Sequence, residues 1–242
     1  PNNILQTGVT LIATNSTFTQ SDAAFLDLES FTFLDPNPQV QLNESSLLLG
    51  TGDAFRVLPG PSAVAGALLS TSDSTITAGN LLHAAQNATL AYSGIAPLLA
   101  IARTTPNANI TDVTLSGSIA NLAGNTDILT NIFAEGVSLT VGATSPLRGG
   151  TIQSPAPLAA PVFSANGANI SAVQAIAVDT ALLEATAPFL QLLNNATLST
   201  AQSAFSFNGS QISSQGSSFL GINGSTMTVA TGDLFRLNNS LL

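Results

Sequence analysis

The chain has 242 residues, of which only 7% are charged, and four Arg against thirteen Asp and Glu give a formal net charge of −9. A nucleic-acid-binding protein needs a cationic surface to displace counterions, and four scattered Arg cannot supply one. The chain also has no Lys, no Cys and one His. This excludes a Walker-type phosphate site, Cys- or Lys-based covalent catalysis and a zinc site.

Hydrophobic residues make up 45% of the chain. They are spread evenly along it, which predicts a folded protein rather than a disordered one. Residues 172–193 form the most apolar stretch, but they contain Asp179, Glu184 and Pro188 and make a poor membrane span. We therefore expect no membrane insertion. The chain opens without a basic start and apolar stretch, which is typical of a mature or excised piece.

Short turns of small polar residues alternate with Ser or Thr and one large apolar residue from residue 15 onward. This pattern recurs at residues 15–18, 44–47, 73–76, 87–90 and 195–198. Two longer strings also return far apart in the chain. TGDAFRV at 51–57 returns as TGDLFRL at 231–237, and APLLAI at 96–101 returns as APFLQL at 187–192. Such returning strings are the sign of a repeat architecture.

The spacing of large apolar residues predicts short strands. They follow one another in steps of seven or eight, as in Leu82, Leu90 and Leu98, and later in Leu198, Phe205, Ile212, Phe219, Met227 and Phe235. Apolar and polar residues alternate at 137–141 and 226–229, as they do in strands. Sandwich strands usually recur every 8–12 residues. The short steps and the returning strings together favour a parallel β-solenoid whose inward apolar residues form one core.

The number of strands per coil stays open. Three strands would make coils of about 22 residues, and four would make a shorter and fatter rod. We expect one domain over residues 1–242. Residues 239–242 resemble the opening of another repeat, so we expect a segment of a longer solenoid or a rod that stacks end to end with neighbouring copies.

Two stretches depart from the strand pattern. Residues 149–168 are rich in Pro, Ala and Gly, which predicts a loop or irregular coil. Residues 171–186 are rich in Ala, with apolar residues at roughly helical spacing. They predict either a short helix or two buried strands at 175–178 and 181–184.

The alternation of Ser/Thr-Leu strands with Ala-Pro-Leu-Leu and Gly-Asp-x-Phe strands resembles the passenger regions of filamentous haemagglutinin-like and autotransporter bacterial exoproteins. The resemblance covers most of residues 8–148 and 187–242. It implies a right-handed parallel β-helix that is exported and serves as a stalk or adhesin. It supplies no catalytic residues to carry over.

Three polar groups are candidates for a site. Asp53 with Arg56, and Asp233 with Arg236, form a repeated Asp-x-x-Arg pair that suits contact with a polar ligand such as a glycan. The same Asp residues also suit turns, where the carboxylate accepts backbone N–H bonds while Arg screens a neighbouring charge. His83 is a candidate general base beside Asp73. We assign no catalytic, cofactor-binding or metal-binding residue, and we expect no cofactor.

The leading hypothesis is a non-catalytic, secreted or cell-surface β-helix with a structural and adhesive role. Its expected partners are host or surface glycans and neighbouring copies, with no nucleic acid. One alternative is a carbohydrate-active β-helix enzyme, such as a polysaccharide lyase or a tailspike-like depolymerase. Another is an ice- or surface-binding solenoid, which needs a flat and regular array of Thr on one face.

Overall fold

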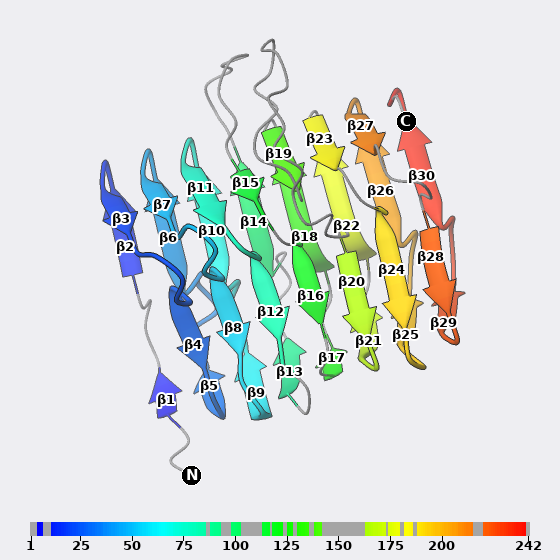
Figure 1. Ribbon diagram of the computed structural model, residues 1–242, viewed down its shortest axis with the longest axis horizontal. Coiled ribbons are helices and arrows are strands. Elements are labelled where there is room, and N and C mark those ends of the chain that lie inside the picture. Colours follow the sequence, from blue (N-terminus) through cyan, green and yellow to red (C-terminus); the bar gives the residue numbers. More distant parts are fainter. Residues whose placement is uncertain are drawn as a thin grey trace.

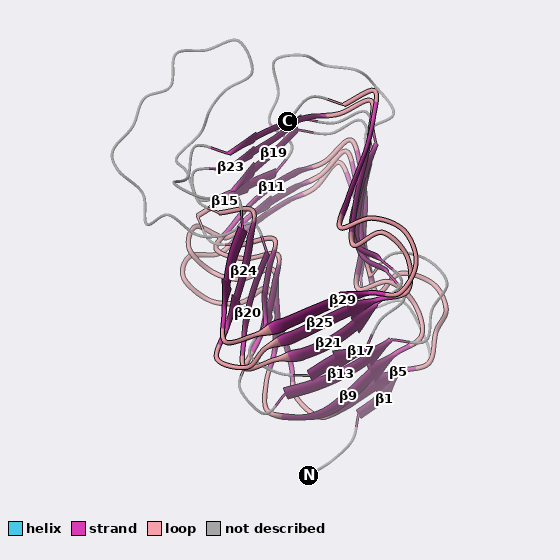
Figure 2. Cartoon of the chain, turned by 90° about the vertical axis from the view of Figure 1, so that its right-hand side faces the viewer, coloured by secondary structure: helices cyan, strands magenta, loops and turns pink. Residues whose placement is uncertain are grey.

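The structure is a computed structural model, and its strands are parallel and stack as a β-solenoid (Figure 1). Each coil contributes one strand to each of four sheets, which enclose a four-sided outline when seen along the stack (Figure 2). The residues that it describes are 4–6, 11–85, 88–92, 98–102, 113–116, 118–122, 125–127, 130–135, 138–141, 163–172, 174–179, 182–185, 188–214 and 220–240.

We name the sheets A to D in the order in which the chain enters them. Sheet A contains eight strands, β1 (Ile4–Gln6), β5 (Phe31–Phe33), β9 (Gly60–Val64), β13 (Ala88–Tyr92), β17 (Asn125–Asp127), β21 (Asn169–Ala172), β25 (Thr197–Thr200) and β29 (Thr226–Val229). Sheet B contains eight strands, β2 (Leu11–Thr14), β6 (Val40–Asn43), β10 (Leu69–Ser72), β14 (Leu99–Ala102), β18 (Thr130–Glu135), β22 (Gln174–Asp179), β26 (Phe205–Asn208) and β30 (Phe235–Asn238).

Sheets C and D contain seven strands each. Sheet C is built from β3 (Thr17–Thr19), β7 (Ser46–Leu48), β11 (Thr75–Ala78), β15 (Val113–Leu115), β19 (Ser138–Val141), β23 (Leu182–Ala185) and β27 (Gln211–Ser214). Sheet D is built from β4 (Leu26–Leu28), β8 (Phe55–Val57), β12 (Leu82–Ala84), β16 (Ala120–Leu122), β20 (Phe163–Asn166), β24 (Leu190–Leu193) and β28 (Leu220–Asn223). The chain therefore uses four strands per coil, the alternative that its sequence left open.

The core is one continuous cluster inside the four sheets. Alternate residues of each strand point inward, so strands that stack in register bring apolar residues together. In sheet D the inward row runs from Leu26 through Phe55 to Leu82. Near the other end, Phe163 of sheet D and Phe205 of sheet B meet across the interior with ring centroids 6.4 Å apart. The interior is therefore filled by side chains.

The corners between sheets B and C are tight turns with a left-handed first residue. Asn15, Glu44 and Asp73 have φ values of 49°, 47° and 50°, and Asn239, which follows the last strand β30, repeats this geometry with a φ of 48°. Each is followed by a serine, namely Ser16, Ser45, Ser74 or Ser240. These turns let the chain change direction within two residues, which is why successive strands lie only seven or eight residues apart.

The corner serines form hydrogen-bonded ladders between coils. The Ser74 hydroxyl accepts from the Ser45 backbone N–H at 3.1 Å and donates to the Ser72 carbonyl at 2.9 Å. The Ser45 hydroxyl accepts from the Ser16 N–H at 3.2 Å in the same way. At the far end of this edge, Ser240 accepts from the Ser210 N–H at 3.0 Å. Each serine thus satisfies backbone groups that the strand ladder does not reach at the corner.

The helix predicted near residues 171–186 is wrong. Within this stretch the structure has the end of β21, then β22 and β23, and the described residues contain no helix. Ile176 of β22 lies in register between Ile132 and Phe205. Ala favours helix only locally, whereas pairing with two neighbouring coils bonds both edges of the segment. The alternative of two strands is the one that the fold adopts, as β22 and β23.

The predicted loop at 149–168 is only partly described. Residues 149–162 lie outside the described residues, while Phe163–Asn166 form β20 and pair with β16 and β24. The loop prediction is therefore wrong for these four residues. None of the described residues forms a helix that is long and apolar enough to cross a membrane.

We expect Ser74→Ala to destabilise the fold by about 1–3 kcal/mol, because it leaves the buried Ser45 N–H without its acceptor. The free energy of unfolding in urea measures the effect. Ser70→Ala, at an outward position of the same coil, is the control and should change stability by no more than about 0.5 kcal/mol. Equal effects of the two substitutions would contradict a structural role for the ladder.

We expect Thr71→Val to stabilise the fold by about 1 kcal/mol, because the Thr71 hydroxyl is buried among Leu42 and Ile101 without a hydrogen-bond partner. Thr200→Val is the matched control. Thr200 is also buried, but its hydroxyl donates to the Gln202 carbonyl at 2.9 Å. Loss of this hydrogen bond in Thr200→Val should lower the urea midpoint of unfolding. If the midpoint falls in Thr71→Val as well, the expectation for Thr71 is wrong.

Candidate functional site

The repeated TGD-x-FR string forms corners on two different faces. Residues 51–57 lead from sheet C into β8 of sheet D, whereas residues 231–237 lead from sheet A into β30 of sheet B. In both copies the Phe packs on the core and the Arg lies outward on the strand. The string therefore forms the same type of corner in both copies, but at different positions in the coil.

Glycine is required in both corners by close contact with the preceding coil. A Cβ on Gly52 would lie 2.0 Å from the Ala23 carbonyl oxygen. Gly232 has a φ of +96°, and a Cβ there would lie 2.6 Å from the Ser203 hydroxyl oxygen. The backbone of each TGD corner therefore packs closely against the preceding coil, and this packing fixes the position of the Asp and Arg that follow.

The first polar cluster lies at the start of sheet D and centres on Asp53. One of its carboxylate oxygens accepts from the Asn80 backbone N–H at 3.1 Å and from the Asn80 side-chain amide at 2.7 Å. The other oxygen lies 2.8 Å from His83 Nδ1. Burial alone would raise the pKa of Asp53, but the hydrogen bonds from His83 and Asn80 together with the His83 charge hold it below its usual value.

The candidate arrangement of His83 beside Asp73 does not occur in the structure. Asp73 occupies the corner between sheets B and C, whereas His83 lies on β12 of sheet D and contacts Asp53 from the preceding coil. Residues ten apart in the chain fall on different faces, while residues about one coil apart are neighbours. The sequence offered no means to see this, because the coil length was open.

Arg56 is neutralised by the coil before it. It lies in register with Asp27, and its Nε and Nη2 atoms donate to the two Asp27 carboxylate oxygens at 2.8 Å each. Asp53 accordingly acts as a turn residue and Arg56 screens a neighbouring charge, as one of the two sequence interpretations predicted. Both side chains of the pair are partly exposed, so it adds little to stability.

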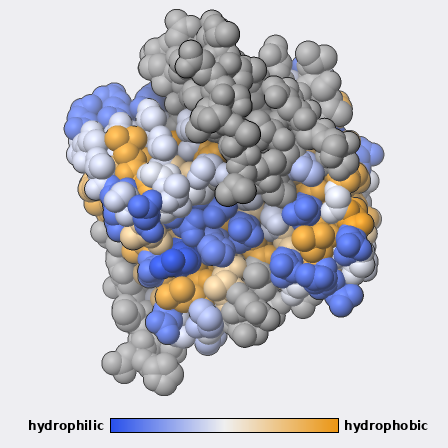
Figure 3. All heavy atoms as spheres, in the orientation of Figure 1, coloured by the Kyte–Doolittle hydropathy of each residue, from blue (hydrophilic) through white to orange (hydrophobic). Residues whose placement is uncertain are grey.

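The face shown in Figure 3 has hydrophilic residues interspersed with smaller hydrophobic groups. Among the described residues, no group of three or more His, Cys, Asp or Glu is placed to hold a metal ion.

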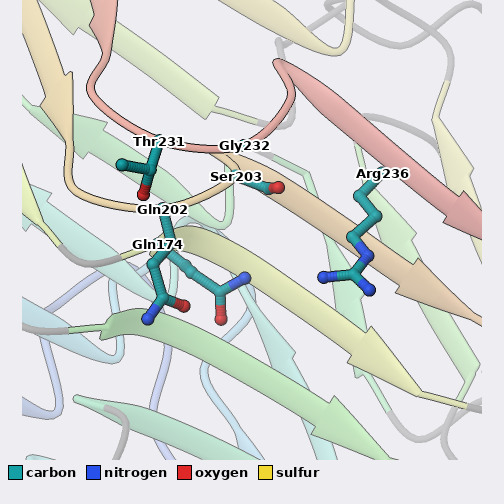
Figure 4. Close-up of a pocket in the computed structure, with 6 residues that line it drawn as sticks. All are labelled: Gln174, Gln202, Ser203, Thr231, Gly232 and Arg236. Carbon is teal, nitrogen blue, oxygen red and sulfur yellow. The ribbon is translucent and has the colours of Figure 1, made fainter.

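The second polar cluster is a hollow of ≈370 Å³ at the corner between sheets A and B. It is lined by Gln174, Gln202, Ser203, Thr231, Gly232 and Arg236, which come from three successive coils (Figure 4). The Gln202 amide and the Arg236 guanidinium extend toward each other across it (Figure 4). Sequence reasoning singled out Arg236 as a site residue and placed Thr231 and Gly232 only in the returning string. It missed Gln174, Gln202 and Ser203, because the shared corner exists only once the coils stack.

Arg236 differs from Arg56 in its neighbour. Its register partner on the preceding strand is Ser206, where Arg56 has Asp27. Within the described part of the chain Arg236 forms no ion pair, and it is exposed at the edge of the hollow. The two copies of the string thus present one paired and one unpaired guanidinium.

Comparison of the chain with protein-family models, with curated proteins and with solved structures returned no match. The resemblance to haemagglutinin-like and autotransporter passenger regions therefore stays a prediction based on the recurring strings.

We expect Asp53→Asn to remove a pH-dependent part of the stability. The pKa of Asp53 is lowered from 3.8 by folding, so its contribution is present above that pH and is lost as pH falls through the lower folded value. The difference in unfolding free energy between wild type and Asp53→Asn should therefore shrink as the pH falls below 3.8. Urea unfolding at each pH measures it.

The matched control is Asp233→Asn at the equivalent position of the second string. No described residue donates a side-chain or backbone hydrogen bond to the Asp233 carboxylate. The same pH-dependent loss in both variants would show that the contacts of Asp53 with Asn80 and His83 are not its cause.

Proposed function

We propose that this protein is a non-catalytic, extracellular or cell-surface solenoid with a structural and adhesive role, and that it binds surface glycans. The observation that carries the proposal is the division of the coils, where the structure describes their burial, into an apolar interior and a largely neutral polar exterior. Continuous parallel pairing makes such a stack stiff, and its outer faces remain free for contact.

Outward rows of hydroxyl and amide groups support glycan binding. Thr197 and Ser199 of sheet A lie in register with Thr226 and Thr228. On sheet D a row runs through Asn121, Ser164 and Gln191. Hydroxyl and amide groups both donate and accept hydrogen bonds, which suits the hydroxyl groups of sugars.

The enzyme alternative would need at least two carboxylates and an Arg in one cleft. The hollow has Arg236, but none of its six lining residues is Asp or Glu. In the other cluster, the Asp53 carboxylate is already held by Asn80 and His83. The geometry of the described residues therefore favours binding over bond cleavage.

The ice-binding alternative would need an unbroken Thr array. On sheet C the outward row runs from Thr19 through Leu48 to Thr77 and Thr114, so Leu48 interrupts it. This irregularity favours the glycan-binding proposal.

The two ends of the described stack expose part of their apolar residues, as the predicted end-to-end contacts between copies would require. Apolar residues of the first and last coils are only partly buried, whereas their counterparts in the middle are enclosed. They are Leu11, Phe18, Phe25 and Leu26 at one end and Leu220, Met227, Val229, Leu234 and Phe235 at the other. A further coil would cover them, whether it belongs to this protein or to a neighbouring copy. Stacking of copies stays part of the proposal.

The test is to present the purified chain to immobilised neutral and acidic polysaccharides, and to follow binding by biolayer interferometry and new reducing ends by a colorimetric assay. We expect saturable binding to at least one glycan class and no new reducing ends. Circular dichroism verifies the β structure, and heat-unfolded chain controls for non-specific adsorption.

Two outcomes would overturn the proposal. Release of new reducing ends or unsaturated sugar products would establish the enzyme alternative. A folded chain without saturable binding to any glycan would exclude the adhesive role.

A further inference from the structure

We propose that the hollow between β22, β26 and β30 binds a carboxylate-bearing sugar unit of an acidic glycan, with the Arg236 guanidinium as the anchor for the carboxylate. This inference deepens the proposed glycan-binding function and rests on it. It names the chemical class of the ligand and the place where the ligand binds.

The first argument is that Arg236 has no carboxylate partner among the described residues. The chain has a net charge of −9, so its few cations have many carboxylates to pair with. Arg56 follows this expectation and holds Asp27 with two hydrogen bonds. Arg236 occupies the same place in the same string, yet its neighbour on the preceding strand is Ser206. A guanidinium fork without a protein carboxylate is well suited to bind the carboxylate of a ligand.

The second argument is the supply of neutral donors and acceptors around Arg236. Ser203 is only 5% exposed, and its hydroxyl oxygen accepts from the Asp233 N–H at 3.1 Å, which leaves its proton for a ligand. The Thr231 hydroxyl donates to the Ala201 carbonyl, which leaves its lone pairs to accept. The amides of Gln174 and Gln202 offer both functions. Such mixed groups match the ring hydroxyls of a sugar.

The third argument is the shape of the hollow. Its ≈370 Å³ lies at the small end of ligand pockets, which run from about 300 to 1,000 Å³. This size suits a single sugar unit. Gly232 shapes one wall, because any side chain there would collide with Ser203.

None of the six residues that line the hollow carries a carboxylate. Asp233 directly follows Gly232, but it is not one of the lining residues, and its backbone rather than its side chain contacts Ser203. An acidic sugar would therefore meet the guanidinium and neutral groups only. A neutral sugar could make the same amide and hydroxyl contacts, but it would lack the charge-assisted pair.

The experiment compares three proteins, the wild type, Arg236→Gln and Arg56→Gln. The probes are an oligogalacturonate and its methyl ester, which keeps the sugar rings and removes the negative charge. Isothermal titration calorimetry measures Kd. We expect the wild type to bind the oligogalacturonate, Arg236→Gln to weaken this binding about tenfold or more, and Arg56→Gln to leave it unchanged.

The methyl ester should bind the wild type about tenfold or more weakly and should be insensitive to Arg236→Gln. Equal Kd values for wild type and Arg236→Gln with the acidic probe would overturn the assignment of the anchor. Equal Kd values for the acid and its ester with the wild type would overturn the carboxylate preference, and this comparison needs no variant.

The outcome also separates this inference from the proposed function. A wild type that binds neutral glycans and not the acidic probe would overturn the inference and leave the adhesive role standing. A wild type that binds no glycan at all would remove both.

Discussion

Parallel, in-register hydrogen bonding between successive coils is the interaction on which the rest of this structure depends. It places residues about one coil apart side by side, as in Asp27, Arg56 and His83 on sheet D. Like charges stacked at this spacing would repel, and polar groups stacked inward would lose their water. The low charge of the chain follows from this constraint. On sheet D, Asp27 and Arg56 are charges of opposite sign in register and form an ion pair, whereas on sheet B two acidic residues, Glu135 and Asp179, lie in register.

The second requirement concerns the corners between sheets. The backbone N–H and C=O groups there lie beyond the strand ladders and need other hydrogen-bond partners if the coil is to close. Left-handed residues such as Glu44 and Asp73 turn the chain, and the serines that follow them carry hydrogen bonds from one coil to the next. At the TGD corners, glycine allows the backbone to approach the preceding coil. The polar residues of this protein are therefore partly structural, which is why their abundance alone does not mark a binding site.

The proposed binding site lies at a charged side chain, Arg236, that has no ion-pair partner among the described residues. Arg56 and Arg236 come from the same string, but only Arg56 has a carboxylate in register on the preceding strand. The difference lies in the neighbouring coil and not in the string itself. This is the reason that the hollow at Arg236, rather than the cluster at Asp53, carries the proposal of a glycan site.

The sequence by itself determined the all-β solenoid, because seven- and eight-residue steps between large apolar residues and far-apart, near-identical strings fit few other architectures. It also predicted that Asp53 accepts a backbone N–H bond, although the donor is Asn80 of the next coil and not a residue of its own turn. Only the tertiary structure decided the four strands per coil, the strand state of residues 174–179 and 182–185, and the partner of His83. These features depend on register between coils, which joins residues about 30 apart, whereas local propensity and spacing act over only a few residues.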